Sequence, residues 1–321
     1  MSTLLPAPAP LPSPSRIAPL LRSSNATAEV MHRLLAASHA QRLSPALDSV
    51  DFEAELAREL AARRVERAFV EAERQAIKRE LREVPTDATQ FVRWFEALEE
   101  TGPGQHDALF PWLAESASHQ QMRWFLRQEL AGEAGFDDLV ALTQIKLPNQ
   151  PKLELARNYW DEMGQGHEGG MHGPMLGALA ESLQLESAGD RDIVWESLAL
   201  SNLMVALATA RHYAYQSVGA LGVIELTAPG RSELVNAGLK RLGIAGAARR
   251  YYALHATLDI RHSAAWNREV LQPLVASNPA IAPRIAEGAL LRLRAGQRCF
   301  ERYRRALWGN GQAPADAAQS S

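Results

Sequence analysis

The chain contains one cysteine, no apolar run long enough to cross a membrane, and no large basic cluster. Because Cys299 stands alone among 321 residues, the chain has no internal disulfide and no cysteine-ligated zinc or iron–sulfur site. The most apolar stretch, residues 198–210, is shorter than a transmembrane helix. A net charge of −3 argues against a nucleic-acid or anionic-membrane partner. We expect a cytoplasmic protein.

Patterns typical of β-strands are also missing. The chain has no series of alternating Val, Ile and Thr residues separated by turn pairs. Its glycine-rich segments do not follow a strand, which excludes a dinucleotide-binding motif and a P-loop. An apolar content of 46% is enough for a sizeable core. The sequence therefore predicts an all-α protein.

Composition divides the chain into four parts. Residues 1–25 are rich in Pro and Ala and are predicted to be a disordered arm, and 311–321 a disordered tail. Residues 26–85 are predicted to form an N-terminal helical extension, and 86–310 the main helical domain. Within these parts, helical periodicity and the positions of Pro and Gly predict the following helical segments: 51–84, 110–145, 152–163, 191–226, 231–243, 246–271 and 280–307.

Three potential metal ligands share one helical stripe near the C-terminus. His255, Asp259 and His262 are separated by four and three residues, so they lie within roughly 60° of one another on a helix. Two imidazoles and a carboxylate suit iron, manganese or zinc, and the lack of thiolate favours iron or manganese. A polar helix face is the alternative interpretation of this triplet taken alone.

Two further acidic signals precede this stripe. Glu162 ends a predicted helix, and a glycine-rich segment separates it from His172, so both side chains can face one space from a broken helix. The alternative is an acidic helix end followed by a loop histidine. Glu225 lies in an apolar, glycine-containing helix, where a carboxylate is costly unless it is paired or metal-bound. It is either a ligand or part of an exposed helix end.

Glu129 and Glu133 form the last signal. They lie one turn apart in the predicted helix over 110–145, so one can be a ligand while the other supports it. The pair of Glu-x-x-His motifs that ferritin-like di-iron bundles require is missing.

With these four blocks in this order, residues 88–305 resemble the heme-oxygenase-like di-iron oxidase and oxygenase family of iron-containing redox enzymes. The resemblance implies a heme-oxygenase-like helical bundle, two Fe²⁺ ions and O2 as co-substrate. It also implies seven metal ligands, with His172 preferred to the nearby His167: Glu133, Glu162, His172, Glu225, His255, Asp259 and His262.

The resemblance assigns these residues to two ions. One ion would be held by Glu133, His172, Asp259 and His262, and the other by Glu162, Glu225 and His255, although bridging carboxylates would blur this division.

The expected partner is a small organic substrate such as an amino acid, amine or fatty acid, and the expected reaction is N-oxygenation, desaturation or C–C cleavage. Arg211 and Arg261 are candidate anchors for a substrate carboxylate, or else surface arginines. A homodimer is possible. The alternatives are a metal-independent enzyme of the same fold, similar to thiaminase or to quinone-cofactor-synthesis enzymes, and a non-catalytic helical scaffold.

Overall fold

The computed structural model describes residues 25–45, 51–185 and 192–308. Most of the predicted N-terminal arm and the whole predicted C-terminal tail lie outside these ranges. The chain divides into a smaller unit, Met1–Ala76, and a larger unit, Ile77–Ser321. All described regular structure is helical, apart from one isolated antiparallel bridge between Met163 and Met171. The all-α prediction is confirmed.

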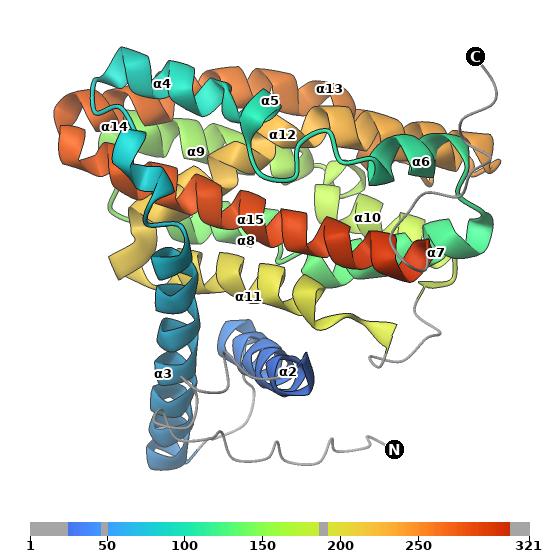
Figure 1. Cartoon of the computed structure of the whole chain (residues 1–321), viewed down its shortest axis with the longest axis horizontal. Helices are drawn as coiled ribbons and strands as arrows, with labels where there is room; N and C mark the ends of the chain where they lie inside the picture. The colour runs from blue at the N-terminus through green and yellow to red at the C-terminus, as the bar shows by residue number, and fades with distance from the viewer. Residues whose placement is uncertain (1–24, 46–50, 186–191, 309–321) are drawn as a thin grey trace. The chain divides into compact units, whose positions relative to one another are not determined.

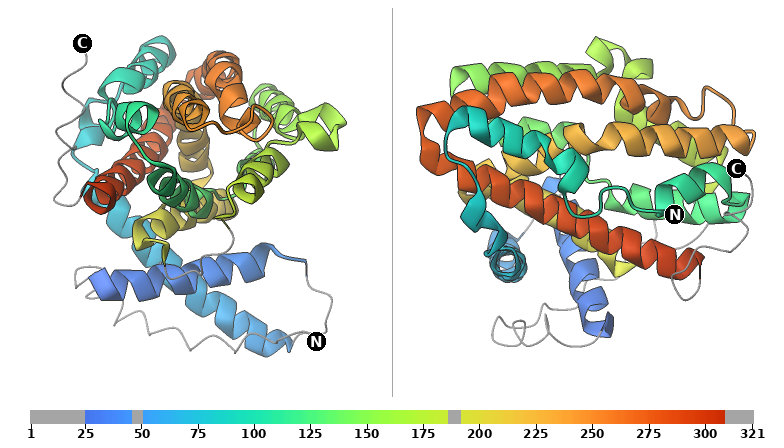
Figure 2. Two further views of the ribbon diagram at one scale, coloured as in Figure 1. Left: turned by 90° about the vertical axis from the view of Figure 1, so that its right-hand side faces the viewer. Right: turned by 45° about the horizontal axis from the view of Figure 1, so that its top comes forward.

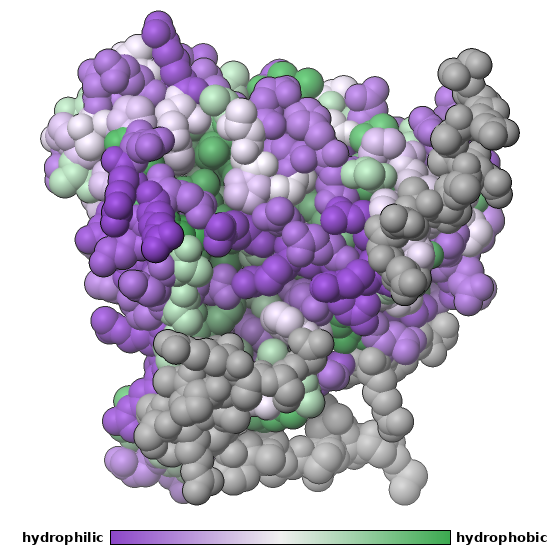
Figure 3. All heavy atoms as spheres, in the orientation of Figure 1, coloured by the Kyte–Doolittle hydropathy of each residue, from purple (hydrophilic) through white to green (hydrophobic). Residues whose placement is uncertain are grey.

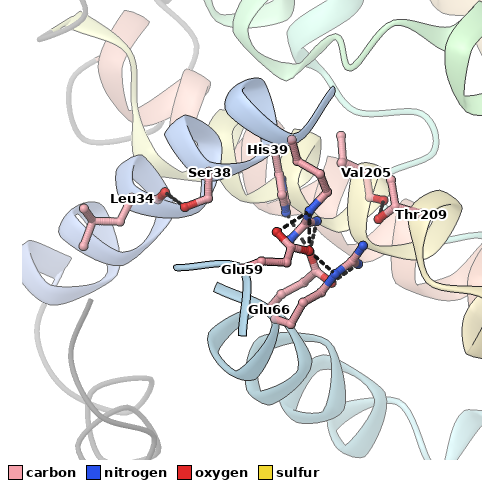
Figure 4. A network of polar contacts seen from close by, with 9 residues as sticks. Leu34, Ser38, His39, Glu59, Glu66, Val205 and Thr209 are labelled. Carbon is pink, nitrogen blue, oxygen red and sulfur yellow. Dashed lines mark hydrogen bonds and ion pairs between the residues drawn. The ribbon is translucent and has the colours of Figure 1, made fainter. Parts of the chain in front are cut away.

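The smaller unit contains two helices, α2 (Asn25–Leu43) and α3 (Phe52–Ala76), joined by a buried ionic network. Glu66 on α3 is only 3% exposed. Its carboxylate lies 2.8 Å from His39 Nε2, 2.7 Å from Arg42 Nη1 and 2.9 Å from Arg63 Nη1 (Figure 4). Because His39 and Arg42 belong to α2, this one carboxylate ties the two helices together.

The contacts of Glu66 should make the stability of this helix pair depend on pH. Burial alone would raise the pKa of Glu66, but hydrogen bonds from His39 and Arg42 lower it from 4.5 to about 2. A lowered pKa means that the network stabilises the fold above pH 4.5 and that this contribution is lost as the pH falls toward 2. The protection factors of the α2 and α3 amides in hydrogen exchange, which correct for the intrinsic effect of pH, should therefore fall over this range.

Substitution tests the same network at neutral pH. Glu66→Gln should destabilise the pair by about 3–5 kcal/mol, because it leaves buried cations without their anion. The protection factors of this variant should depend much less on pH between 4.5 and 2. Glu55→Gln, at an exposed position of α3, is the matched control and should behave like the unaltered protein. Unchanged exchange in Glu66→Gln would contradict the prediction.

The larger unit is a bundle of helices (Figure 1). In the left view of Figure 2 several of them are seen nearly end-on. In chain order the elements are η1 (Glu80–Glu83), α4 (Ala88–Glu96), α5 (Leu98–Thr101), α6 (Leu109–Glu115), α7 (His119–Gly132), α8 (Phe136–Thr143), α9 (Asn149–Glu162), η2 (Gly164–Gly166), η3 (Glu168–Gly170), α10 (His172–Ser182), α11 (Trp195–Thr209), η6 (Arg211–Tyr213), α12 (Ala214–Arg241), α13 (Arg250–Ala265), η7 (Trp266–Leu271), α14 (Gln272–Ser277), η8 (Pro279–Ile281) and α15 (Ala282–Leu307).

Helix α12 is central to the bundle and packs most extensively on α13 and α15. Its approach to α15 depends on glycine. A Cβ atom added to Gly219 of α12 would lie 1.9 Å from the carbonyl oxygen of Ile285, and one added to Gly288 of α15 would lie 1.8 Å from that of Gln216. The two backbones thus touch at positions where no side chain fits.

Several predicted helix boundaries were wrong. The helix predicted over 51–84 ends at Ala76, and the one predicted over 191–226 is divided into α11, η6 and α12. The predicted helix over 110–145 is divided into α6, α7 and α8, with Gly135 in a left-handed conformation at φ 72° between the last two. Conversely, α12 continues through Pro229, where the sequence predicted a break. Proline removes one backbone hydrogen bond, but burial of both flanking segments of α12 supports the helix.

Apolar side chains of the larger unit gather in its interior. The face seen in Figure 3 is mainly hydrophilic, with apolar residues showing in small groups between polar ones. Among the described residues, no helix is both long and apolar enough to span a membrane. The buried set also contains acidic and histidine side chains, which define the site described next.

Candidate metal centre

Six of the seven predicted ligands converge inside the larger unit. Their side chains are acidic or imidazole and come from four helices that the core brings together. Helix α9 supplies Glu162, α10 supplies His172, α12 supplies Glu225, and α13 supplies His255, Asp259 and His262. Five of them are at most 8% exposed, and His255 is partly buried.

A tight loop places Glu162 beside His172. Met163 and Met171, the residues that flank the loop, form the isolated antiparallel bridge. A Cβ atom on Gly164 (φ 60°) would lie 2.3 Å from the carbonyl carbon of Gly170, so only glycine permits this closure. The glycine-rich segment therefore ends one helix and starts the next, as the broken-helix interpretation predicted, while His167 is left exposed on the loop.

Two groups of possible ligands share Glu162. Among the described residues, one ligand atom each from Glu162, His172 and His255 lie within 4.8 Å of one another, and so do those from Glu162, Glu225 and His262. His172 Nδ1 lies 2.6 Å from Glu162 Oε2, and the His172 and His255 ring centroids are 4.6 Å apart. His262 Nδ1 lies 3.4 Å from Glu225 Oε2.

This grouping differs from the division that the resemblance implied. His172 lies with His255 rather than with His262, and His262 lies with Glu225. The difference arises because His255 and His262 share one face of α13 but are almost two turns, or about 10 Å, apart along its axis, so each meets ligands at a different level of the bundle. Glu162, at the end of α9, reaches both groups.

Surrounding groups fix which nitrogen each histidine presents. His255 Nδ1 donates to the backbone carbonyl of Tyr251 at 2.7 Å, which leaves Nε2 with a free lone pair. His262 Nε2 donates to Asp161 Oδ2 at 3.1 Å, which leaves Nδ1 facing Glu225. Hydrogen bonds of this kind orient histidines that bind metals.

Sequence reasoning missed two positioning residues, Asp161 and Asn158. The Asn158 side-chain amide donates to Glu225 Oε1 at 2.6 Å. The available signal was helical spacing, because Asn158 precedes Glu162 by four residues and therefore shares its face of α9.

The carboxylates are buried without a permanent cation. Among the described residues, no Arg or Lys forms an ion pair with Glu162, Glu225 or Asp259. Burial, followed by repulsion from Glu225, raises the pKa of Glu162 to about 9. Burial, with repulsion from Glu225 and Glu162, raises the pKa of Asp259 to about 10. Three acidic groups in one interior space are unfavourable unless a cation joins them.

The pKa values of the three histidines are shifted in opposite directions. Burial and the neighbouring His262 lower the pKa of His172 to about 4. Burial and His172 lower the pKa of His255 to about 4. Burial alone would also lower the pKa of His262, but Glu225 and Asp161 raise it to about 9. His172 and His255 are thus neutral at pH 7, the form that binds metal ions.

Unsatisfied buried atoms show that the donor set fits metal ions. Asp259 Oδ1, His172 Nδ1 and His262 Nδ1 are buried and make no hydrogen bond. His172 Nδ1 is close to Glu162 but lacks hydrogen-bond geometry, so its lone pair is available. Orphaned buried polar atoms are rare in folded proteins. Carboxylate oxygens and imidazole nitrogens without thiolate suit ferrous iron.

Glu133, the seventh predicted ligand, borders the cavity next to this cluster but belongs to neither group of three. It follows α7 in an extended conformation, and its Oε1 accepts a hydrogen bond from Phe136 N at 3.0 Å. Its side chain is accessible because it faces a cavity of about 200 Å³ that Glu162, His172, Glu225, His255 and Asp259 also line. Glu129 lines the same cavity near Arg231 and Arg292, so the two glutamates are not interchangeable.

The two arginines singled out as carboxylate anchors do not line this cavity. Arg211 donates to the carbonyl oxygens of Leu142, Thr143 and Ile145, where it closes the end of α8. Arg261 is exposed on α13. Their positions fit the alternative that both are surface arginines.

The sequence comparisons agree with this geometry. Residues 123–297, which are 175 of the 321 residues, match a family described as iron-containing redox enzyme. The matched segment includes all seven predicted ligands. A search of curated proteins found no match.

Proposed function

Because the chain belongs to the family of iron-containing redox enzymes, we propose that it is an O2-dependent di-iron oxidase or oxygenase acting on a small organic substrate. The observation that carries this proposal is the pair of ligand groups joined by Glu162. Two sets of carboxylate and imidazole donors with one shared carboxylate are what two adjacent iron ions require.

Charge balance supports two ions rather than one. Glu133, Glu162, Glu225 and Asp259 carry four negative charges when deprotonated, and two ferrous ions carry four positive charges. In this proposal Glu162 would be shared by the ions, His172 and His255 would hold one of them, and Glu225 and His262 would hold the other. Asp259 and Glu133 complete the set from the cavity side. Two bound ferrous ions would supply electrons for the reduction of O2.

The protein orients the metal ligands and provides a largely apolar cavity for the substrate. Asp161 and the Tyr251 carbonyl orient His262 and His255, and Asn158 orients Glu225. Leu176, Leu200, Met204, Ile224 and Val235 line the cavity next to the ligands. Such a wall excludes water and holds an organic molecule against the metal ligands.

Iron binding tests the proposal directly. Anaerobic addition of Fe²⁺ to metal-free protein should load two ions per chain, measured as protein-bound iron after desalting, and exposure to air should then consume O2. His255→Ala should reduce both bound iron and O2 uptake because it removes one ligand of the Glu162–His172 group. His167→Ala, on the exposed loop, should leave both unchanged.

Three results would contradict the proposal: fewer than two ions per chain at saturation, loaded protein that does not react with O2, or a His255→Ala variant indistinguishable from His167→Ala. Loading should also release protons and weaken in acid, because Glu162, Asp259 and His262 hold protons at neutral pH in the metal-free state. Calorimetry in buffers of different ionisation enthalpy measures this release.

A further inference from the structure

The cavity contains a second charged site, formed by Arg231 of α12 and Arg292 of α15. Arg231 follows Glu225 by six residues on α12, which separates the two positions by about 9 Å along the helix axis. One cavity is therefore lined by potential metal ligands beside Glu225 and by guanidinium groups further along α12. The sequence analysis singled out neither arginine.

Both guanidinium groups have unused hydrogen-bond donors. Arg231 donates from Nη2 to Thr227 Oγ1 at 2.8 Å, and its guanidinium carbon lies 5.9 Å and 5.5 Å from the ring centroids of Phe110 and Phe300. Arg292 has no hydrogen-bond or ion-pair partner among the described residues. A guanidinium has five N–H donors, so most donors of this pair are available to a ligand.

The local charge is unbalanced. Burial and the nearby Arg292 lower the pKa of Arg231 to about 10, partly opposed by Glu129, so Arg231 stays protonated at neutral pH. Burial also lowers the pKa of Arg292, but a guanidinium group is not deprotonated in proteins. Glu129 favours both charges and Glu133 favours that of Arg292, but neither acid forms an ion pair within 4.0 Å of either arginine, and burial raises the pKa of both carboxyl groups. Neighbouring carboxylates therefore compensate the two guanidinium charges only in part. A buried unpaired charge is costly unless a ligand neutralises it.

We propose that Arg231 and Arg292 bind the carboxylate of the substrate, whose apolar body extends along the cavity toward Glu162 and His255. This inference rests on the proposed function and adds the substrate class, an organic monocarboxylate that reacts away from its acidic end. Planar guanidinium groups bind carboxylates through paired hydrogen bonds. The apolar side chains that line the same cavity suit a hydrocarbon body.

Binding to metal-free protein tests this inference independently of iron chemistry. Linear carboxylates from butanoate to dodecanoate are titrated by calorimetry, each against the primary alcohol of the same length. At the best length the carboxylate should bind at least about tenfold tighter than its alcohol. Arg292→Met should remove this preference, while affinity for the alcohol stays within about twofold.

Arg284→Met is the matched control, since Arg284 lies on the same helix α15 but is exposed. It should keep the preference for carboxylate. Circular dichroism checks that each variant is folded, and the comparison of carboxylate with alcohol on the unaltered protein does not depend on any variant.

Three results would overturn the inference: no carboxylate preferred over its alcohol, a preference that survives Arg292→Met, or an alkyl phosphate that binds tighter than the carboxylate of equal length. The iron titration separates the two proposals. Carboxylate preference without iron binding would refute only the metal function, and iron binding without carboxylate preference would refute only the anchor.

Discussion

Glu162→Gln is expected to weaken binding of both iron ions of the proposed centre while making the metal-free protein more stable. Glu162 belongs to both ligand groups, and a neutral amide is a poor substitute for a bridging carboxylate. The affinity for Fe²⁺ should fall about a hundredfold or more, because removal of supporting residues alone costs ten- to a hundredfold. Protein-bound iron after anaerobic loading and desalting measures the loss.

The stability gain follows from the sign of the pKa shift. The pKa of Glu162 is raised from 4.5 to about 9, so in the absence of metal its ionisation opposes folding once the pH exceeds 4.5. The amide that replaces this carboxyl group in the variant cannot ionise, and this opposition disappears. The melting temperature of metal-free Glu162→Gln should therefore exceed that of the unaltered protein by several degrees at pH 7.

Glu168→Gln is the matched control for this pair of effects. Glu168 lies on the loop just after Glu162 but is exposed, so its substitution should change neither iron content nor melting temperature. A Glu162→Gln variant that retains both ions would show that Glu162 is not shared between them. Loss of iron together with loss of stability would mean that Glu162 serves the fold rather than a metal site.

Gly288→Ala is expected to disrupt the bundle. The added methyl group would lie 1.8 Å from the Gln216 carbonyl oxygen, a backbone atom that cannot move aside without displacing α12. The cost should be about 4 kcal/mol or more, measured as the free energy of unfolding in urea. Because α12 also carries Glu225, iron binding should fail together with the fold.

The matched control is Gly230→Ala on α12, where an added Cβ meets no atom within 4 Å. Alanine is the better helix former by about 1 kcal/mol, so this variant should be as stable as the unaltered protein or slightly more stable. Gly288→Ala with near-normal stability would show that the two helices can separate at little cost. Gly219→Ala, which places a methyl group 1.9 Å from the Ile285 carbonyl oxygen, tests the same contact from the other helix.

The sequence by itself determined the helical class and the local parts of the site. Periodicity places His255, Asp259 and His262 on one stripe of a helix, since spacing along a helix needs no tertiary information. The glycine-rich segment between Glu162 and His172 likewise predicts a broken helix, because glycine and chain reversal are local properties. The order of motifs in the family that the sequence resembles then favoured His172 as the ligand over His167, which is exposed.

Only the tertiary structure decided how the ligands group and what faces them. The sharing of Glu162, the support from Asp161 and Asn158, and the meeting of Arg231 with Arg292 all join helices that are distant in sequence. The helix through Pro229 also escaped prediction, because packing overrides the local preference of proline there. The break at Gly135, in contrast, follows glycine's own tolerance of positive φ and was overlooked in the sequence. Which residues share one face of a helix depends on their spacing alone. How ligands from different helices meet depends on how closely those helices approach, and here buried backbone contacts at glycine set that distance.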